Sequence, residues 1–254
     1  MGDPSPTGPV AAVVVVVPAR DEAHLIESSL RSIAFAVHDD LPLAQVLVVV
    51  VDDHSTDATA RLAADTLSAA GVAHLVVSTV QGTAGGARAD GVRAALPHLR
   101  ASPDQTWVLS TDADTVVPAD WVRRYLVHAE HGALAVAGVV TLRTDTDTDT
   151  DTGADLDRLR VAWWAAYGPT LTADGTHPHV HAANMGVRLD VLQAVGGIPA
   201  VARGEDRELW RWLRAAGVVP IADAELVVAT SARLRGRVPE GFAHALGRLG
   251  GVHA

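Results

Sequence analysis

The sequence predicts an α/β fold in which a mostly parallel sheet is flanked by helices, with a smaller mixed region in the second half. Two valine-rich runs, at residues 10–17 and 46–51, are continuous rather than alternating, which is typical of strands buried on both faces. A stretch with helical spacing of apolar residues follows each run. Strands that alternate with helices in this way favour a parallel sheet covered on both faces.

Each element of the first half can be placed from these patterns. Ser55 or Thr56 is expected to cap the second helix. The expected strands are residues 10–17, 46–51, 73–78 and 107–110, and the expected helices are residues 22–36, 56–70 and 86–96.

The second half is less regular, and its elements are short. Residues 1–9 are expected to form a disordered leader, residues 10–230 one domain, and residues 231–254 an arginine-rich tail or lid. The expected strands of this half are residues 134–142, 218–221 and 225–229, and the expected helices are residues 155–167, 190–195 and 205–216.

Composition excludes several classes of function. The 254 residues carry a formal net charge of −10, which argues against a nucleic-acid binder because such proteins need a basic footprint. The chain has no cysteine and no lysine, so it can form no thiolate metal site and no lysine Schiff base. No apolar run approaches the roughly 20 residues of a membrane helix, and no signal peptide is recognisable. We therefore expect a cytoplasmic protein, with peripheral membrane contact left open.

Two aspartates, Asp112 and Asp114, follow the apolar run of residues 107–110. If this run is a buried strand, both carboxylates lie at its carboxyl end, where open α/β sheets bind ligands. Converging carboxylates repel each other unless a cation or a hydrogen-bonded ligand joins them. A divalent ion that carries substrate phosphates meets this need, and the motif therefore predicts such a site.

Acidic and small polar residues also follow the first two strands, at residues 18–22 (PARDE) and 52–57 (DDHSTD). Turn and helix-cap chemistry explains each segment when it is taken alone, because Asp, Ser and Thr suit both. The functional interpretation is that an aspartate of the second segment accepts hydrogen bonds from a nucleobase or a ribose.

Two further segments open predicted helices. Residues 82–88 (GTAGGAR) form either a flexible turn or a loop that places Arg88 near a diphosphate, and they match no Walker loop. Residues 204–209 (GEDREL) place acidic residues in a first helical turn, where the helix dipole favours them. A carboxylate there could also act as a general base, provided that a hydroxyl lies within hydrogen-bond reach.

The order of these segments is more specific than any one of them. Two further segments, residues 183–188 (ANMGVR) and the glycine pair at 196–197, lie between the acidic motifs at 112–114 and 204–209. Over residues 13–217 the whole series closely resembles glycosyltransferase family 2, whose members have the GT-A fold. The resemblance implies an inverting, metal-dependent transfer of a sugar from a nucleotide-diphosphate sugar to an acceptor hydroxyl.

The resemblance also implies a role for each matching residue. Asp114 and Asp112 would bind Mg²⁺ or Mn²⁺, and His244 and His253 are the candidates for a third ligand. Asp206 would be the general base, with Glu205 orienting it or binding the acceptor. UDP is the expected nucleotide and GDP the alternative, whereas the acceptor is not specified. The residues expected to bind the nucleotide sugar are Pro18, Arg20, Glu22, Asp52, Arg88, Asp112 and Asn184.

The chain departs from the family pattern in two places. Asp21 stands where the family commonly has asparagine, which adds a charge near the diphosphate. The QxxRW motif and membrane helices of processive synthases are missing, which favours a single transfer over polymer synthesis. Two other functions stay open: a nucleotidyltransferase of related fold, which would usually have a glycine-rich basic loop after the first strand, and a non-catalytic sugar-nucleotide-binding module.

Four other features have weaker interpretations. The Thr/Asp repeat at 144–152 is expected to be a polar loop, with a calcium-binding surface as the alternative. Trp163 and Trp164 are expected in the core, although they could stack against an acceptor sugar. The arginines of the tail could close over an anion. The alternating His177, His179 and His181 are expected in a loop, with metal binding on one strand face as the alternative.

Overall fold

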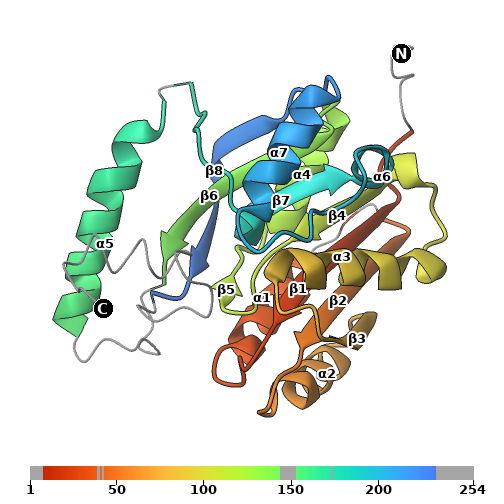
Figure 1. Ribbon diagram of the computed structural model, residues 1–254, viewed down its shortest axis with the longest axis horizontal. Coiled ribbons are helices and arrows are strands. Elements are labelled where there is room, and N and C mark those ends of the chain that lie inside the picture. The colour runs from red at the N-terminus through yellow and green to blue at the C-terminus, as the bar shows by residue number, and fades with distance from the viewer. Residues whose placement is uncertain (1–7, 39–40, 42, 144–152, 173, 233–254) are drawn as a thin grey trace.

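The structure is a computed structural model that describes residues 8–38, 41, 43–143, 153–172 and 174–232. An eight-stranded mixed sheet forms its centre, and helices cover both faces (Figure 1). This confirms the predicted fold class. His244, the Thr/Asp repeat and nearly all of the tail lie outside the described residues.

The strands follow the order β3-β2-β1-β4-β7-β6-β8-β5 across the sheet. Neighbouring strands are parallel from β3 to β4 and again between β6 and β8, whereas β7 is antiparallel to both of its neighbours and β5 is antiparallel to β8. The strands are β1 (Ala12–Ala19), β2 (Gln45–Asp53), β3 (His74–Thr79), β4 (Thr106–Ser110), β5 (Thr115–Val116), β6 (Ala135–Leu142), β7 (Met185–Arg188) and β8 (Ile221–Thr230).

Helices α1, α2 and α4 cover one face of the sheet, and α3, α6 and α7 cover the other, while α5 stands beside β6 and β8 (Figure 1). No helix among the described residues is long and apolar enough to cross a membrane. The helices are α1 (Ile26–His38), α2 (Thr59–Ala69), α3 (Ala84–Ala95), α4 (Trp121–Glu130), α5 (Gly153–Tyr167), α6 (Leu189–Ala194) and α7 (Glu205–Ala215).

The valine run of β1 explains why both faces are covered. Val13 and Val15 pack in the core under α1 and α4, whereas Val14 and Val16 pack in the core under α3, α6 and α7. Successive side chains of a strand point to opposite faces, so a continuous apolar run supplies both cores at once. The run is completely buried, as expected for a central parallel strand.

Four elements after β4 differ from the expected ones. The strands β5 and β7 and the helix α4 were not predicted, because β5 and β7 have only 2 and 4 residues and two arginines interrupt the apolar residues of α4. The two short strands expected at 218–221 and 225–229 are one strand, β8. Its pairing with β6 shifts register at Gly138 and Val139, so that residues 224–226 bulge from the ladder and break the pattern that a regular strand would show.

Candidate active site

The predicted motifs meet at the carboxyl ends of β1, β2 and β4. Ala19 at the end of β1 lies beside Asp52 of β2, and Val16 of β1 lies beside Ser110 at the end of β4. Parallel strands place their ends at the same edge of a sheet, and that edge is the usual ligand site in open α/β folds. The sheet therefore brings segments far apart in sequence to one place.

Asp21 joins the loops that follow β1 and β2. Its backbone adopts a left-handed conformation with φ of 48°, which aspartate tolerates better than most residues. Its backbone N–H donates to Ser55 Oγ at 2.9 Å, and its Oδ1 accepts from the N–H and the hydroxyl of Thr56. The predicted helix cap is therefore wrong: these two hydroxyl residues bind the neighbouring loop, and Ala58 occupies the cap position of α2.

Asp52 carries a polar atom that protein groups do not satisfy. Its side chain is only 8% exposed, and its Oδ1 has no hydrogen-bond partner among the described residues. Leaving a buried acceptor unpaired costs free energy, so a ligand that donates a hydrogen bond here would bind favourably. Asp53 is different, because its Oδ1 accepts from the backbone N–H of Gly82 at 3.1 Å.

The first residues of the predicted nucleotide site lie on the same loop. Glu22 is buried, and its backbone N–H donates to Thr59 Oγ1 at 2.7 Å. Pro18 is partly buried and Arg20 is exposed. All three follow or end β1 beside Asp52, so the loop is placed where the sequence predicts it.

Asp112 and Asp114 lie just beyond β4 in different surroundings. The Asp114 side chain is buried, and its Oδ1 accepts from Thr230 Oγ1 of β8 at 3.2 Å. Arg143, also buried, donates to the backbone oxygen of Asp114 at 3.4 Å. The side chain of Asp112 is 37% exposed. One carboxylate of the pair is thus fixed within the fold, while the other reaches solvent.

Arg88 connects this pair with the start of α7. The guanidinium is 2% exposed, and its Nε donates to Ser110 Oγ at 2.8 Å. Its Nη1 donates to Glu205 Oε1 at 2.7 Å, and its Nη2 donates to Asp112 Oδ1. The sequence places Arg88 at the site, but the side chain is used to join two carboxylates from distant segments rather than left open to a diphosphate.

The glycines before Arg88 allow this approach. Gly85 and Gly86 lie in the first turn of α3 rather than in a flexible loop. A Cβ at Gly85 would stand 2.4 Å from the backbone oxygen of Pro199 and 2.8 Å from the Cβ of Glu205. Only a residue without a side chain lets α3 come this close to the start of α7.

Asp206 lies beside Glu205 in the first turn of α7, after Gly204 in a left-handed conformation. Its Oδ2 accepts from the backbone N–H of Ala182 at 3.3 Å, and its Oδ1 accepts from the N–H of Arg207 at 2.7 Å. Burial raises the pKa of Asp206 above its ordinary value, and the charge of Glu205 adds to this effect. A carboxylate of raised proton affinity can take a proton from a hydroxyl.

Asn184 differs from the sequence-based expectation. It is fully buried, and its Oδ1 accepts from Trp121 Nε1 at 3.0 Å and from the Tyr125 hydroxyl at 2.9 Å. Its Nδ2 donates to the backbone oxygens of Val139 and Leu226. The hydrogen-bonding capacity of its side-chain amide is used inside the protein, so in this conformation the amide has no hydrogen bond left for a sugar. Its role is to join α4, β6 and the bulge of β8.

The three alternating histidines form a stacked column near Asp206. His179 stacks on Tyr167 with ring centroids 3.8 Å apart, and His181 lies 5.9 Å beyond His179. Burial lowers the pKa of His181 to about 3, so this imidazole is neutral at physiological pH. Among the described residues, these histidines belong to no group of three or more side chains suited to hold a metal. Residues 177–181 also form no strand, so the loop interpretation is favoured. Trp163 is in the core, but Trp164 is 54% exposed.

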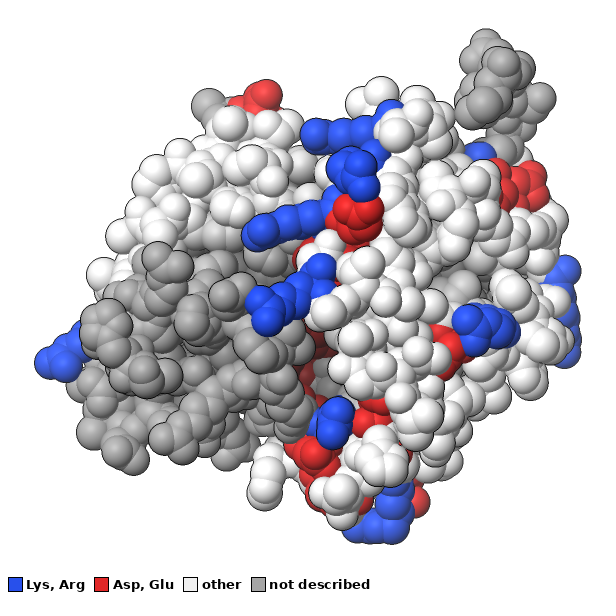
Figure 2. Space-filling view, in the orientation of Figure 1, with Lys and Arg blue, Asp and Glu red and all other residues white. Residues whose placement is uncertain are grey.

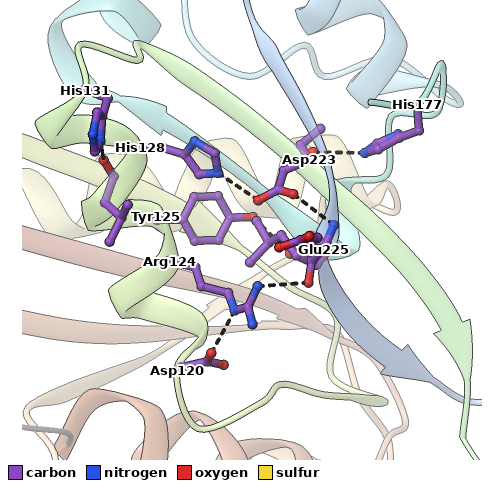
Figure 3. Close-up of polar contacts among 12 residues, drawn as sticks. Asp120, Arg124, Tyr125, His128, His131, His177, Asp223 and Glu225 are labelled. Atoms are coloured by element: carbon purple, nitrogen blue, oxygen red, sulfur yellow. Dashed lines mark hydrogen bonds and ion pairs between the residues drawn. The ribbon is translucent and has the colours of Figure 1, made fainter. Parts of the chain in front are cut away.

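A second polar cluster, which the sequence patterns did not suggest, lies between α4 and the start of β8 (Figure 3). His128 Nε2 lies 2.8 Å from Asp223 Oδ2, and Arg124 donates to the backbone oxygen of Glu225 at 3.1 Å. Burial by itself raises the pKa of Asp223, but the hydrogen bonds from His128 and the Glu225 N–H bring it below its ordinary value. The cluster fixes α4 against the bulged strand.

The comparisons with known proteins agree with this architecture. The fold is the one found in GT-A glycosyltransferases. The sequence profile of glycosyl transferase family 2 matches residues 14–196. The chain belongs to this family. No curated protein matches the chain in sequence.

Several solved structures share the fold. Mannosyltransferase PcManGT from Pyrobaculum calidifontis, in complex with GDP-Man and Mn²⁺, has a TM-score of 0.63 and 24% identity over 96% of this chain and 61% of its own. TarS from S. aureus, in complex with UDP-GlcNAc, has a TM-score of 0.59 and 17% identity over 95% of this chain and 66% of its own. Glucosyl-3-phosphoglycerate synthase from Mycobacterium tuberculosis, in complex with phosphoglyceric acid, has a TM-score of 0.52 and 18% identity over 94% of this chain and 76% of its own. The chain thus spans less than two thirds of the first two proteins.

Proposed function

We propose that this protein transfers a sugar from a nucleotide-diphosphate sugar to an acceptor hydroxyl, with a divalent metal ion and with inversion at the anomeric carbon. Family membership and the shared fold support sugar transfer. UDP is the proposed nucleotide, and GDP is the alternative, because the similar structures include complexes with UDP-GlcNAc and with GDP-Man.

The residues present fit a metal ion whose coordination the substrate completes. Asp112 and Asp114 offer carboxylate oxygens at one edge of the sheet. Mg²⁺ in nucleotide sites is usually bound by one or two carboxylates together with substrate phosphates and water, so a pair of aspartates is sufficient. When bound, such an ion would neutralise charge on the departing diphosphate. His244, a candidate third ligand, lies outside the described residues.

Asp206 is the proposed general base. Its carboxylate would take the proton of the acceptor hydroxyl while the hydroxyl oxygen forms a bond to the anomeric carbon. The bond from that carbon to the diphosphate oxygen breaks, and its electron pair leaves with the nucleoside diphosphate. Attack opposite the leaving group inverts the carbon, so an α-linked donor gives a β-linked product.

The observation that carries this proposal is the buried connection between the base and the metal-binding pair. Glu205, the neighbour of Asp206, and Asp112 both accept hydrogen bonds from Arg88. A guanidinium presents its donors in a rigid fork, so the first turn of α7 is held at a set position relative to β4. Precise placement of this kind is what bimolecular catalysis needs.

The test is product analysis with UDP-linked and GDP-linked sugars in the presence of Mn²⁺. The expected result is release of a nucleoside diphosphate, with water or an added hydroxyl compound as acceptor. A nucleotidyltransferase would instead consume or release pyrophosphate, and a binding module would release nothing.

The rate of this release should depend on pH through Asp206. Because its pKa is raised above 3.8 by burial, the base is protonated at a higher pH than an ordinary aspartate. Activity requires the deprotonated form, so the rate should fall as the pH drops through this raised pKa, with the midpoint above pH 3.8. Donor binding measured at the same pH values separates protonation of the base from protonation of the metal-binding pair. A rate that stays constant down to pH 3.8, with donor binding intact, would contradict the assignment.

A further inference from the structure

The surroundings of Asp206 differ on its two sides. On one side, Glu205 is paired with the buried Arg88, which leads to the metal-binding pair. On the other side, Ala182 donates its N–H to the Asp206 carboxylate, and the histidine column begins at the preceding residue, His181. The donor would occupy the first side, so the second side is where an acceptor would approach.

Arg207 is the cation on this second side. It follows Asp206 directly, and its side chain is exposed. Its backbone N–H donates to Asp206 Oδ1 at 2.7 Å, and its positive charge contributes to the lowered pKa of both His179 and His181. Within the described part of the chain, Arg207 forms no ion pair, and the neighbouring imidazoles are neutral at physiological pH. Its charge is therefore available to a ligand.

The position of Arg207 distinguishes it from the other arginines of α7. Figure 2 shows basic side chains in a line over this helix and acidic side chains in the hollow below it. Arg211, one turn further along, is paired with Glu208. Arg214 is exposed on the same face, but at a rise of about 1.5 Å per residue it lies about 10 Å further from the base. Among the arginines of α7, only Arg207 combines an available charge with proximity to Asp206.

We propose that the acceptor is anionic: the hydroxyl that Asp206 deprotonates belongs to a small molecule with a phosphate or carboxylate group, which Arg207 binds. This inference rests on the proposed function and names its substrate class. A chain with a net charge of −10 repels such a molecule in general, so a local cation beside the base is needed to hold it. An arginine suits the task because its planar fork matches the oxygens of phosphate and carboxylate.

The experiment compares phosphorylated compounds with their neutral counterparts. The protein is saturated with Mn²⁺ and with whichever of UDP and GDP binds, so that the donor site is filled. Glycerol 3-phosphate, glucose 6-phosphate and ribose 5-phosphate are then titrated beside glycerol, glucose and ribose. The same compounds are supplied as acceptors with the corresponding nucleotide sugar, and KM and kcat are measured separately.

Arg207→Gln is the test variant, and Arg214→Gln is its matched control on the same helix face. The expected result is a preference of tenfold or more for the phosphorylated member of at least one pair, which Arg207→Gln abolishes through KM and Arg214→Gln retains. Absence of such a preference, or equal losses in both variants, would overturn the inference. Nucleotide binding and donor turnover with water, measured on the same samples, show separately whether the proposed function itself holds.

Discussion

Replacing Asp206 with asparagine should lower the rate of sugar transfer by about 1,000-fold, within the range expected for loss of a general base. Asparagine has nearly the same shape and can still accept a hydrogen bond from the Ala182 N–H, which the aspartate accepts at 3.3 Å. It cannot take a proton from a hydroxyl. Steady-state release of nucleoside diphosphate measures the effect, and titration of the nucleotide should show an unchanged dissociation constant.

Glu208→Gln is the matched control for this variant. Glu208 lies in the same helical turn, but its carboxylate faces Arg211 and Trp212 rather than the site. This variant should keep nearly the full rate. If Asp206→Asn retained more than a tenth of the wild-type rate, the base would have to be another residue.

Replacing Arg88 with methionine should destabilise the protein by about 3 kcal/mol and abolish transfer. Removing one partner of a buried ionic network leaves its other members unpaired, which typically costs about 3–5 kcal/mol. The lower end applies here because Asp112 is partly exposed. The freed carboxylates of Glu205 and Asp112 should also repel each other and separate the base from the metal-binding pair. Urea unfolding measures the change in the free energy of unfolding.

Arg93→Met provides the control on the same helix. Arg93 is paired with Asp90 at the surface, and exposed pairs contribute about 0–1 kcal/mol. This variant should unfold within about 1 kcal/mol of the wild type and keep its activity. Equal stability of the two variants would show that the Arg88 network does not hold the site together.

The first half of the fold was predictable because its signals are local. The valine run of β1 and the helical spacing before residue 38 each identify an element without knowledge of the rest of the chain. The position of the two aspartates, at the edge where β1, β2 and β4 end, was predictable for a related reason, since strand ends in parallel sheets coincide. The boundaries were less accurate, because Glu22 and Ser55 looked like helix residues but belong to loops that bind each other.

The roles of Arg88 and Asn184 could not be predicted in the same way. Arg88 contacts a residue 117 positions away, and Asn184 contacts residues 63 and 59 positions away. Such contacts depend on how the sheet is completed by β7 and β8, which the periodicity of the sequence did not reveal. The family motif predicts a ligand contact for Asn184, whereas in the structure its side-chain amide donates to two buried backbone oxygens.

The metal-dependent nucleotide site is tested by calorimetric titration of UDP and of GDP, each with and without Mn²⁺, into the wild type, Asp114→Asn and Asp120→Asn. Asp120 is a matched control because it pairs with Arg124 at the surface, away from the site. We expect that one nucleotide binds only with Mn²⁺, that Asp114→Asn weakens this binding at least tenfold, and that Asp120→Asn leaves it unchanged. Binding that is equally tight in Asp114→Asn, or no binding of either nucleotide with Mn²⁺ present, would contradict this expectation.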